Sequence, residues 1–175
     1  MGVDSDAPGW LLMTVVHRFT LPIPPSVRDA WRPAKGRGLV PSREVLEYRA
    51  TVAQILSGRL PIHGPVVCEL TVYFARDSGD LSNRLKVLED ALEGFAYHDD
   101  KQIRGYSRLW REVDPANPRV VLRVEGERFA TREEARAHRD AKAAANQKRK
   151  VTLHRNRAAK NLAKMQLKPA VTRPR

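Results

Sequence analysis

A run of β-branched and aromatic residues, followed at once by a leucine-periodic segment, constrains the fold of this chain most. Residues 65–75 are rich in Val, Tyr and Phe and predict a strand. The run Ser78-Gly79-Asp80 ends that strand, and leucines at helical spacing predict a helix over roughly 81–93. The core face of this helix is expected to carry Leu81, Leu85, Leu88 and Leu92.

Further elements surround this strand and helix. Strands are predicted over 13–21, 102–113 and 118–126, and a helix is predicted from an N-cap at Ser42 to about Leu56. Residues 27–41 predict a loop, and residues 114–118 predict a hairpin turn. The order β-α-β-α-β-β indicates an α/β domain with a small mixed sheet flanked by helices. The stripe expected on the first helix is Val45, Tyr48, Val52 and Leu56.

Charge divides the chain into two parts. Residues 1–130 hold 18 Lys and Arg against 17 Asp and Glu, whereas residues 131–175 hold 14 against 3. In the second part, Thr131 and Glu134 form a capping-box pattern before a stretch of good helix formers. We therefore expect a domain over 1–130 and a basic extension over 131–175 that is largely helical or partly disordered. Such an extension favours DNA, RNA or an anionic membrane surface as a partner.

Cysteine content and hydropathy bear on the cellular compartment. Cys68 is the one cysteine, so no internal disulfide can form, and its place on a predicted strand indicates a buried residue. The apolar stretch 10–16 is much shorter than a membrane span. We expect a cytoplasmic protein with no membrane segment.

Acidic residues bracket the helix predicted over 81–93. Asp80 stands where the helix begins, and Asp99-Asp100 stand in a turn before the next strand. Carboxylates that converge from strand ends suit Mg²⁺ or Mn²⁺, and Lys86 could stabilise charge on a reacting phosphodiester. Taken alone, these residues favour plainer roles as a helix cap, a polar turn and a solvated lysine.

The motifs around these residues resemble those of the RusA family of Holliday-junction resolvases. The family pattern reads approximately D-(L/I)-D-N-x-x-K, then D-A-L, then D-D-x-Q-(V/I). This chain has D-L-S-N-R-L-K over 80–86, E-D-A-L over 89–92 and D-D-K-Q-I over 99–103. Residues 21–26 are similar to the family's opening strand and its Pro-Pro-Ser turn. The resemblance covers about residues 15–126 and leaves out the extension.

The resemblance implies roles for individual residues. Asp80 and Asp100 match metal-binding catalytic aspartates, and Lys86 matches an essential lysine. Asn83 and Gln102 match motif positions that we expect to be scaffold. The resemblance also implies a homodimer that uses Mg²⁺ or Mn²⁺ to nick opposed strands of a four-way junction. Its setting would be a bacterial or phage-infected cell.

Ser82 departs from the family pattern, which has an aspartate at this position. A hydroxyl is a weaker metal ligand than a carboxylate and supplies no charge. Asp99, or with less reason Glu89, could compensate for the missing carboxylate. Ser82 could instead mark a site with weakened or lost catalysis.

Basic residues outside these motifs are candidates for DNA contact. They are Arg28, Arg32, Lys35 and Arg37 in the predicted loop, Arg104 and Arg108 on the following strand, and Lys148, Arg149 and Lys150 in the extension. Arg104 and Arg108 are expected to share a strand face with Tyr106 and Trp110. Three functions stay open: a structure-selective endonuclease, a catalytically weakened branched-DNA-binding protein of the same fold, and a basic RNA-binding protein.

Overall fold

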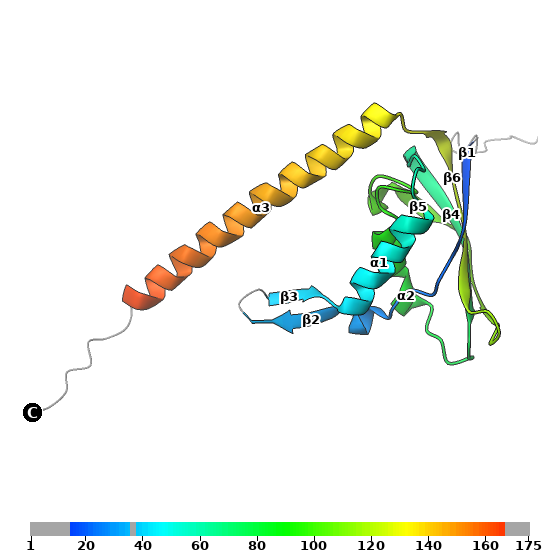
Figure 1. The fold of residues 1–175 in the computed structure, drawn as a ribbon, viewed down its shortest axis with the longest axis horizontal. Helices are drawn as coiled ribbons and strands as arrows, with labels where there is room; N and C mark the ends of the chain where they lie inside the picture. Colours follow the sequence, from blue (N-terminus) through cyan, green and yellow to red (C-terminus); the bar gives the residue numbers. More distant parts are fainter. Residues whose placement is uncertain (1–14, 36–37, 167–175) are drawn as a thin grey trace, which may run out of the picture. The chain divides into compact units, whose positions relative to one another are not determined.

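The computed structural model describes residues 15–35 and 38–166, and its body is built on a four-stranded sheet. In sheet order the strands are β1 (Val15–Leu21), β6 (Arg119–Phe129), β4 (Ile62–Phe74) and β5 (Ile103–Val113) (Figure 1). β4 is parallel to β5, whereas β6 is antiparallel to both β1 and β4. The predicted α/β class with a small mixed sheet is therefore confirmed. Met13 and Thr14, the predicted start of the first strand, lie outside the described residues.

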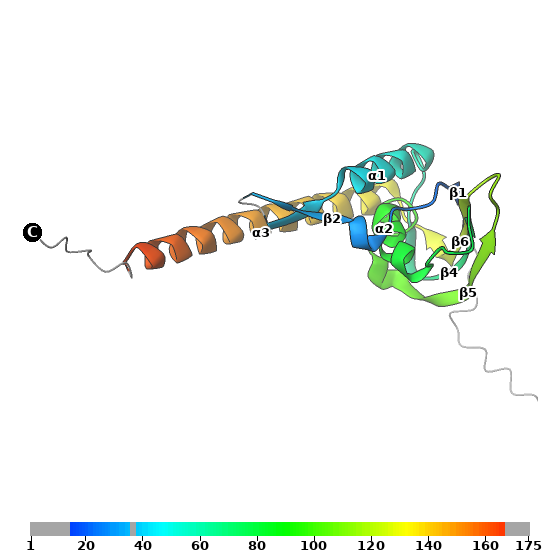
Figure 2. The same cartoon turned by 90° about the horizontal axis from the view of Figure 1, so that it is seen from below.

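Two helices, α1 (Arg43–Ile55) and α2 (Ser82–Leu92), lie on one face of this sheet (Figures 1 and 2). The predicted stripe of α1 and its C-cap is buried throughout, because residues three to four apart face the same way on a helix. It consists of Val45, Tyr48, Val52 and Leu56.

The buried face of α2 differs from the predicted leucine stripe. Val87 and Ala91 are buried together with Leu88 and Leu92, whereas Leu81 and Leu85 are only partly buried against the core. The leucine spacing predicted which side of α2 is apolar, but it did not predict which residues on that side are buried. A valine and an alanine complete the buried side of α2.

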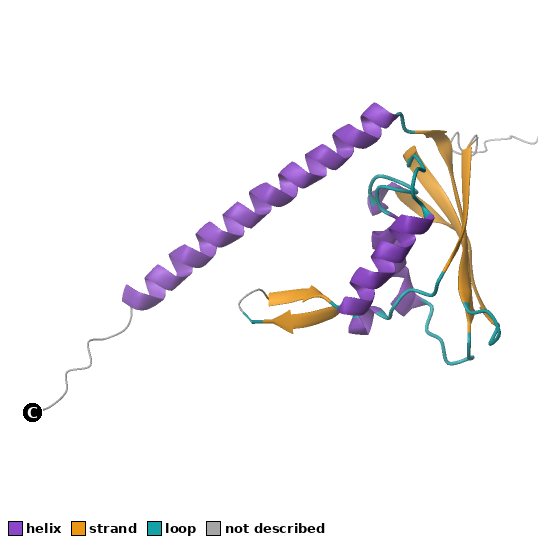
Figure 3. Ribbon diagram, viewed as in Figure 1, coloured by secondary structure: helices purple, strands orange, loops and turns teal. Residues whose placement is uncertain are grey.

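Residues 27–41 were expected to form a loop, and this prediction is wrong. They contain a short 3₁₀-helix, η2 (Val27–Asp29), and an antiparallel hairpin of β2 (Trp31–Ala34) and β3 (Gly38–Pro41). The hairpin forms a separate two-stranded sheet that projects from the body (Figure 3). Its strands are four residues long and largely exposed, so their sequence carries almost no apolar alternation to detect.

The turn over 114–118 was expected to join a hairpin, and this expectation is also wrong. β5 and β6 are consecutive in the chain, but β4 lies between them in the sheet. Strand pairing depends on the whole sheet order, which a local turn pattern does not determine. Cys68 on β4 is buried, as predicted.

The C-terminal extension forms a single helix, α3 (Arg132–Gln166). Its capping box is present: the Glu134 N–H donates to Thr131 Oγ1 at 3.1 Å, and the Thr131 N–H donates to Glu134 Oε2 at 2.8 Å. The chain divides into two compact units between Ala135 and Arg136. Across the described residues, no helix is both long and apolar enough to cross a membrane.

Candidate active site

Asp80 caps the N-terminal end of α2. Its Oδ1 accepts hydrogen bonds from the Ser82 hydroxyl at 2.7 Å, the Ser82 N–H at 3.0 Å and the Asn83 N–H at 3.4 Å. Its Oδ2 accepts a further one from the Asn83 side-chain amide. These donors, the Ser82 hydroxyl first, hold the pKa of Asp80 below its ordinary value, so the group is ionised at neutral pH. The plainer role considered for Asp80, a helix cap, is present in the structure.

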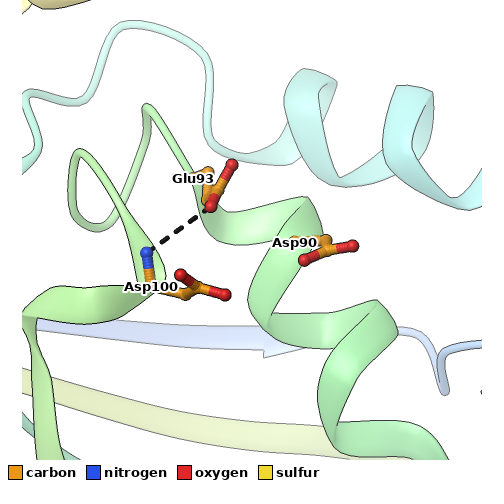
Figure 4. A group of neighbouring side chains, drawn as sticks. All are labelled: Asp90, Glu93 and Asp100. Carbon is orange, nitrogen blue, oxygen red and sulfur yellow. Dashed lines mark hydrogen bonds between the residues drawn. The ribbon is translucent and has the colours of Figure 1, made fainter.

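Three carboxylates converge at the other end of α2. Asp90 lies in its last turn, Glu93 is the C-cap, and Asp100 opens the 3₁₀-helix η3 (Asp100–Gln102) (Figure 4). One ligand oxygen from each lies within 4.8 Å of the other two. The Asp100 N–H also donates to Glu93 Oε1 at 3.5 Å. We call these three residues the carboxylate triad.

Lys86 joins two members of the triad. Its Nζ lies 2.9 Å from Asp90 Oδ1, one helical turn further on, and it also forms an ion pair with Asp100 Oδ2. Hydrogen bonds to Asp100 and then to Asp90 raise the pKa of Lys86 well above its ordinary value. The same contact with Lys86 lowers the pKa of Asp100. Lys86 and Asp100 are therefore both charged at neutral pH, and the cation offsets the repulsion between the neighbouring carboxylates.

The turn that carries Asp100 is anchored by its neighbours. Gln102 Nε2 donates to the Ile62 carbonyl at 3.1 Å, and Gln102 Oε1 accepts from the N–H groups of His98 and Asp99. Asp99 Oδ1 accepts from the Lys101 N–H at 3.0 Å and caps η3. Gln102 thus occupies the scaffold position expected of it, and Asp99 acts here as a cap outside the triad.

The acidic residues of α2 point to different partners. Asp90 Oδ2 accepts from Arg49 Nη2 of α1 at 3.0 Å, which fixes the carboxylate from a second helix. Glu89 instead accepts from the Tyr106 hydroxyl at 2.7 Å. Of the two residues considered as replacements for the carboxylate missing at Ser82, neither Asp99 nor Glu89 belongs to the triad.

Asp80 and Asp100 are not brought together, and the sheet topology explains why. β4, α2 and β5 form a parallel β-α-β unit, in which β4 ends at one end of the paired strands and β5 starts at the other end. Asp80 follows the end of β4, and Asp100 precedes β5. Among the described residues, Asp80 belongs to no group of three carboxylate, His or Cys ligands.

Sequence reasoning missed Asp90 and Glu93 as potential ligands. A signal for both was present, because at 100° per residue they lie on the same side of α2 as Lys86. The three carboxylates fit a divalent cation such as Mg²⁺ or Mn²⁺, since both prefer oxygen ligands. Asp100 is the residue common to this set and to the residues selected from sequence.

A cavity of about 390 Å³ opens beside Asp80. Arg28, Arg76 and Arg84 contribute to its walls, together with Asn83. Arg84 is anchored by a hydrogen bond from Nη1 to the Pro24 carbonyl at 2.7 Å. The N-terminal end of α2 therefore presents cationic side chains near a carboxylate, whereas the other end presents carboxylates around one lysine.

The other basic candidates lie in different parts of the body. Arg32 and Lys35 are exposed at the projecting hairpin, and Arg37 lies outside the described residues. Arg104 and Arg108 are exposed on β5, and the Arg108 guanidinium lies 5.7 Å from the Trp110 ring centroid.

The face expected to unite Arg104, Tyr106, Arg108 and Trp110 does not form, because β5 is irregular. Its register against β4 shifts twice: Cys68 pairs with Tyr106, but the next residue, Glu69, pairs with Arg108. Consecutive strand residues point to opposite faces, so Tyr106 and Arg108 do too. Tyr106 packs against the helix side of the sheet, and Arg108 faces away from it.

The basic residues predicted in the extension do not share one side of α3. Adjacent residues of a helix are about 100° apart, so Lys148 points well away from Lys150 while Arg149 lies between them. All three are exposed.

Comparison with known proteins identifies the family of the body. A sequence profile for the endodeoxyribonuclease RusA family matches residues 22–125, more than half of the chain. The chain belongs to the RusA family. The matched range contains Asp80, Lys86 and the carboxylate triad, and it excludes α3. RusA-family proteins are endodeoxyribonucleases that act on branched DNA junctions, and they typically depend on a metal. No curated protein matches the chain at a significant level.

Proposed function

We propose that this RusA-family chain is a metal-dependent endonuclease that resolves Holliday junctions by paired nicking. The process it would serve is recombination, repair or the processing of phage DNA. The observation that carries the proposal is the convergence of Asp90, Glu93 and Asp100 within 4.8 Å, with Lys86 paired to two of them. The alternative endonuclease site, at Asp80, lacks the carboxylate that the family pattern places at position 82, which is a serine here.

The triad is the set that would hold Mg²⁺ or Mn²⁺, and Asp100 is the member that was also selected from sequence. Asp80, the other ligand expected from sequence, would act at the N-terminal end of α2 instead. When bound, such a cation activates water and neutralises charge on a phosphodiester. Arg49 and the anchored η3 turn keep Asp90 and Asp100 oriented before substrate arrives. Asp99 and Ser82, proposed from sequence as possible ligands, would instead have structural roles, Ser82 at the start of α2 and Asp99 as the cap of η3.

Lys86 would act on the phosphate. Its ammonium is held over the triad by two carboxylates and is more than half exposed, so a phosphate oxygen can reach it. A cation at this place stabilises the negative charge that develops as the phosphodiester is attacked. From the N-terminal end of α2, Asp80 would orient the DNA strand or the water that attacks its phosphodiester. Arg28 and Arg84 of the adjacent cavity would bind a neighbouring phosphate.

Paired nicking requires two such sites. Each protomer has one triad, and a twofold-symmetric homodimer would direct two of them at opposed strands of a four-way junction. Arg32, Lys35, Arg37, Arg104 and Arg108 are the further candidates for contacts with junction arms. Such contacts would position the DNA rather than read its sequence.

A second function is favoured by Ser82. Its hydroxyl donates to Asp80 and satisfies a carboxylate that the family pattern would place beside another carboxylate. A chain with this arrangement could bind branched DNA with weakened catalysis.

A synthetic four-way junction distinguishes the two functions. Purified full-length protein is incubated with labelled junction in Mg²⁺ or Mn²⁺ over a range of pH, and both symmetric nicks are mapped. The endonuclease proposal expects nicks that disappear in Asp100→Asn while junction binding persists. Binding without nicks under all these conditions overturns it in favour of the junction-binding protein. Equal affinity for junction, duplex and RNA would favour the basic RNA-binding function.

A further inference from the structure

Helix α3 carries its positive charge mainly on one side. At 100° per residue, six of the eight cations from Arg139 to Lys160 fall within about 100° of arc. They are Arg139, Lys142, Arg149, Lys150, Arg157 and Lys160, and we call them the basic stripe. The opposite side holds several alanines together with Val151 and Leu162, and its cations are Lys148 and Arg155. The arrangement is therefore directional rather than an even coat of charge.

Four cations of this stripe, Arg139, Arg149, Lys150 and Lys160, carry the argument on charge. Asp140 is the one acidic residue after Ala135, and it lies 3.9 Å from Arg136, which is outside the stripe. Among the residues that the structure describes, no carboxylate forms an ion pair with Arg139, Arg149, Lys150 or Lys160. Like charges so close together repel each other and disfavour the helix. An anionic partner would remove that cost.

The spacing of the stripe suits a polymer of phosphates. From Arg139 to Lys160 the helix rises about 32 Å, and duplex DNA carries about one charge per 1.7 Å of axis. A duplex therefore presents phosphates along the whole length of the stripe. A membrane surface fits less well: between Arg132 and Gln166 there is no Phe, Trp or Tyr, and the side opposite the stripe mixes alanine, Val151 and Leu162 with the charged residues Asp140, Lys148 and Arg155.

We propose that the basic stripe of α3 is a second DNA-binding site, which holds the sugar-phosphate backbone of a duplex arm without reading its sequence. The proposal takes DNA as the partner because the RusA domain acts on DNA, but it does not depend on cleavage there. It lies outside residues 22–125, the part that defines the family. Its consequence is tighter, salt-dependent retention of the junction.

Two charge-matched variants of the full chain test the direction of the site. The stripe variant is Arg149→Gln with Lys160→Gln, and the control is Arg155→Gln with Lys148→Gln on the opposite side. Each loses one Arg and one Lys that are exposed in the structure. Affinity for a short linear duplex is measured without divalent metal at several salt concentrations, so cleavage does not enter. Circular dichroism verifies equal helix content.

The stripe variant should reduce the slope of log affinity against log salt by about 1.8, and reduce affinity near 0.1 M salt by up to about 60-fold. The control variant should retain the slope of the unmodified chain, because the proposal places Lys148, a candidate for DNA contact from sequence, on the side of α3 that faces away from the duplex. Equal losses in both variants would overturn a directional site, and no loss in either would overturn DNA binding by α3. Stripe-dependent binding that is stronger for phosphatidylserine vesicles or for RNA than for duplex would also overturn it. Failure to nick a junction would contradict the proposed function alone.

Discussion

Lys86 forms an ion pair with Asp100, fourteen residues further along the chain, and so joins the middle of α2 to η3, which precedes β5. The same ammonium reaches Asp90 at 2.9 Å. A single cation thus holds together two carboxylates that would otherwise repel each other. This relationship places the lysine of the family motif at the triad rather than beside Asp80.

Replacing Lys86 with methionine should remove catalysis and leave junction binding nearly intact. The side chain keeps its length but loses the charge that would stabilise the reacting phosphate, a loss that typically costs about 100-fold or more in rate. Single-turnover cleavage and equilibrium binding of the same junction measure the two quantities separately. Lys86→Arg serves as the charge-preserving control. Unchanged cleavage by the methionine variant would remove Lys86 from the mechanism.

Asp100→Asn and Asp80→Asn should differ in metal binding, although both should abolish nicking. Asp100 is a member of the triad, so its loss should weaken Mn²⁺ binding to DNA-free protein by more than about tenfold, the lower range of losses for supporting residues. Asp80→Asn should leave Mn²⁺ binding close to that of the unmodified chain. Calorimetric titration with Mn²⁺ gives both values. The reverse order of effects would move the metal to the N-terminal end of α2.

Ser82→Asp should raise nicking activity or reduce the metal concentration that nicking requires. The substitution replaces a hydroxyl that donates to Asp80 with a second carboxylate, which restores the anionic pair of the family pattern. Ser82→Asn is the matched control, since it has nearly the same shape without the charge. A decrease in activity with aspartate but not with asparagine would show that the added charge harms a site built around Ser82.

The start of α3 should lose order in acid. Hydrogen bonds from Arg128 and then from the Thr131 N–H lower the pKa of Glu134 to about 2. Because the folded-state pKa is below the ordinary value near 4.5, the stabilisation is complete above that value and is lost as pH falls toward 2. Amide chemical shifts of residues 131–135, followed from pH 6 to 2, report the change. Glu134→Gln should remove this pH dependence, and a midpoint near 4.5 in the unmodified chain would contradict the lowered pKa.

The sequence was most informative where a local pattern of residues is enough to determine the structure. The stripe of α1 was predicted residue by residue because helical spacing alone selects Val45, Tyr48 and Val52, and the capping box of α3 needed only Thr131 and Glu134. Residues 31–41 were missed because a short exposed hairpin buries too little to require apolar alternation.

The candidate site was harder to predict, since its geometry depends on sheet order and register. Asp80 and Asp100 could be selected from their motif, but their separation follows from the parallel pairing of β4 with β5. The division of Tyr106 from Arg108 follows from a register shift that leaves no mark in the residue pattern. Asp90 belongs to the triad because it lies one helical turn after Lys86 and so faces the same side of α2.

The placement of Asp80 and the triad at opposite ends of α2 has an evolutionary consequence. The hydrogen bonds of Asp80 come from Ser82 and Asn83, whereas Asp100 is positioned by Lys86 and by the η3 turn. The two ends can therefore acquire substitutions independently. A lineage can exchange an aspartate for a serine at position 82 without disturbing the carboxylates of the triad, and selection can adjust strand handling and metal affinity as separate traits.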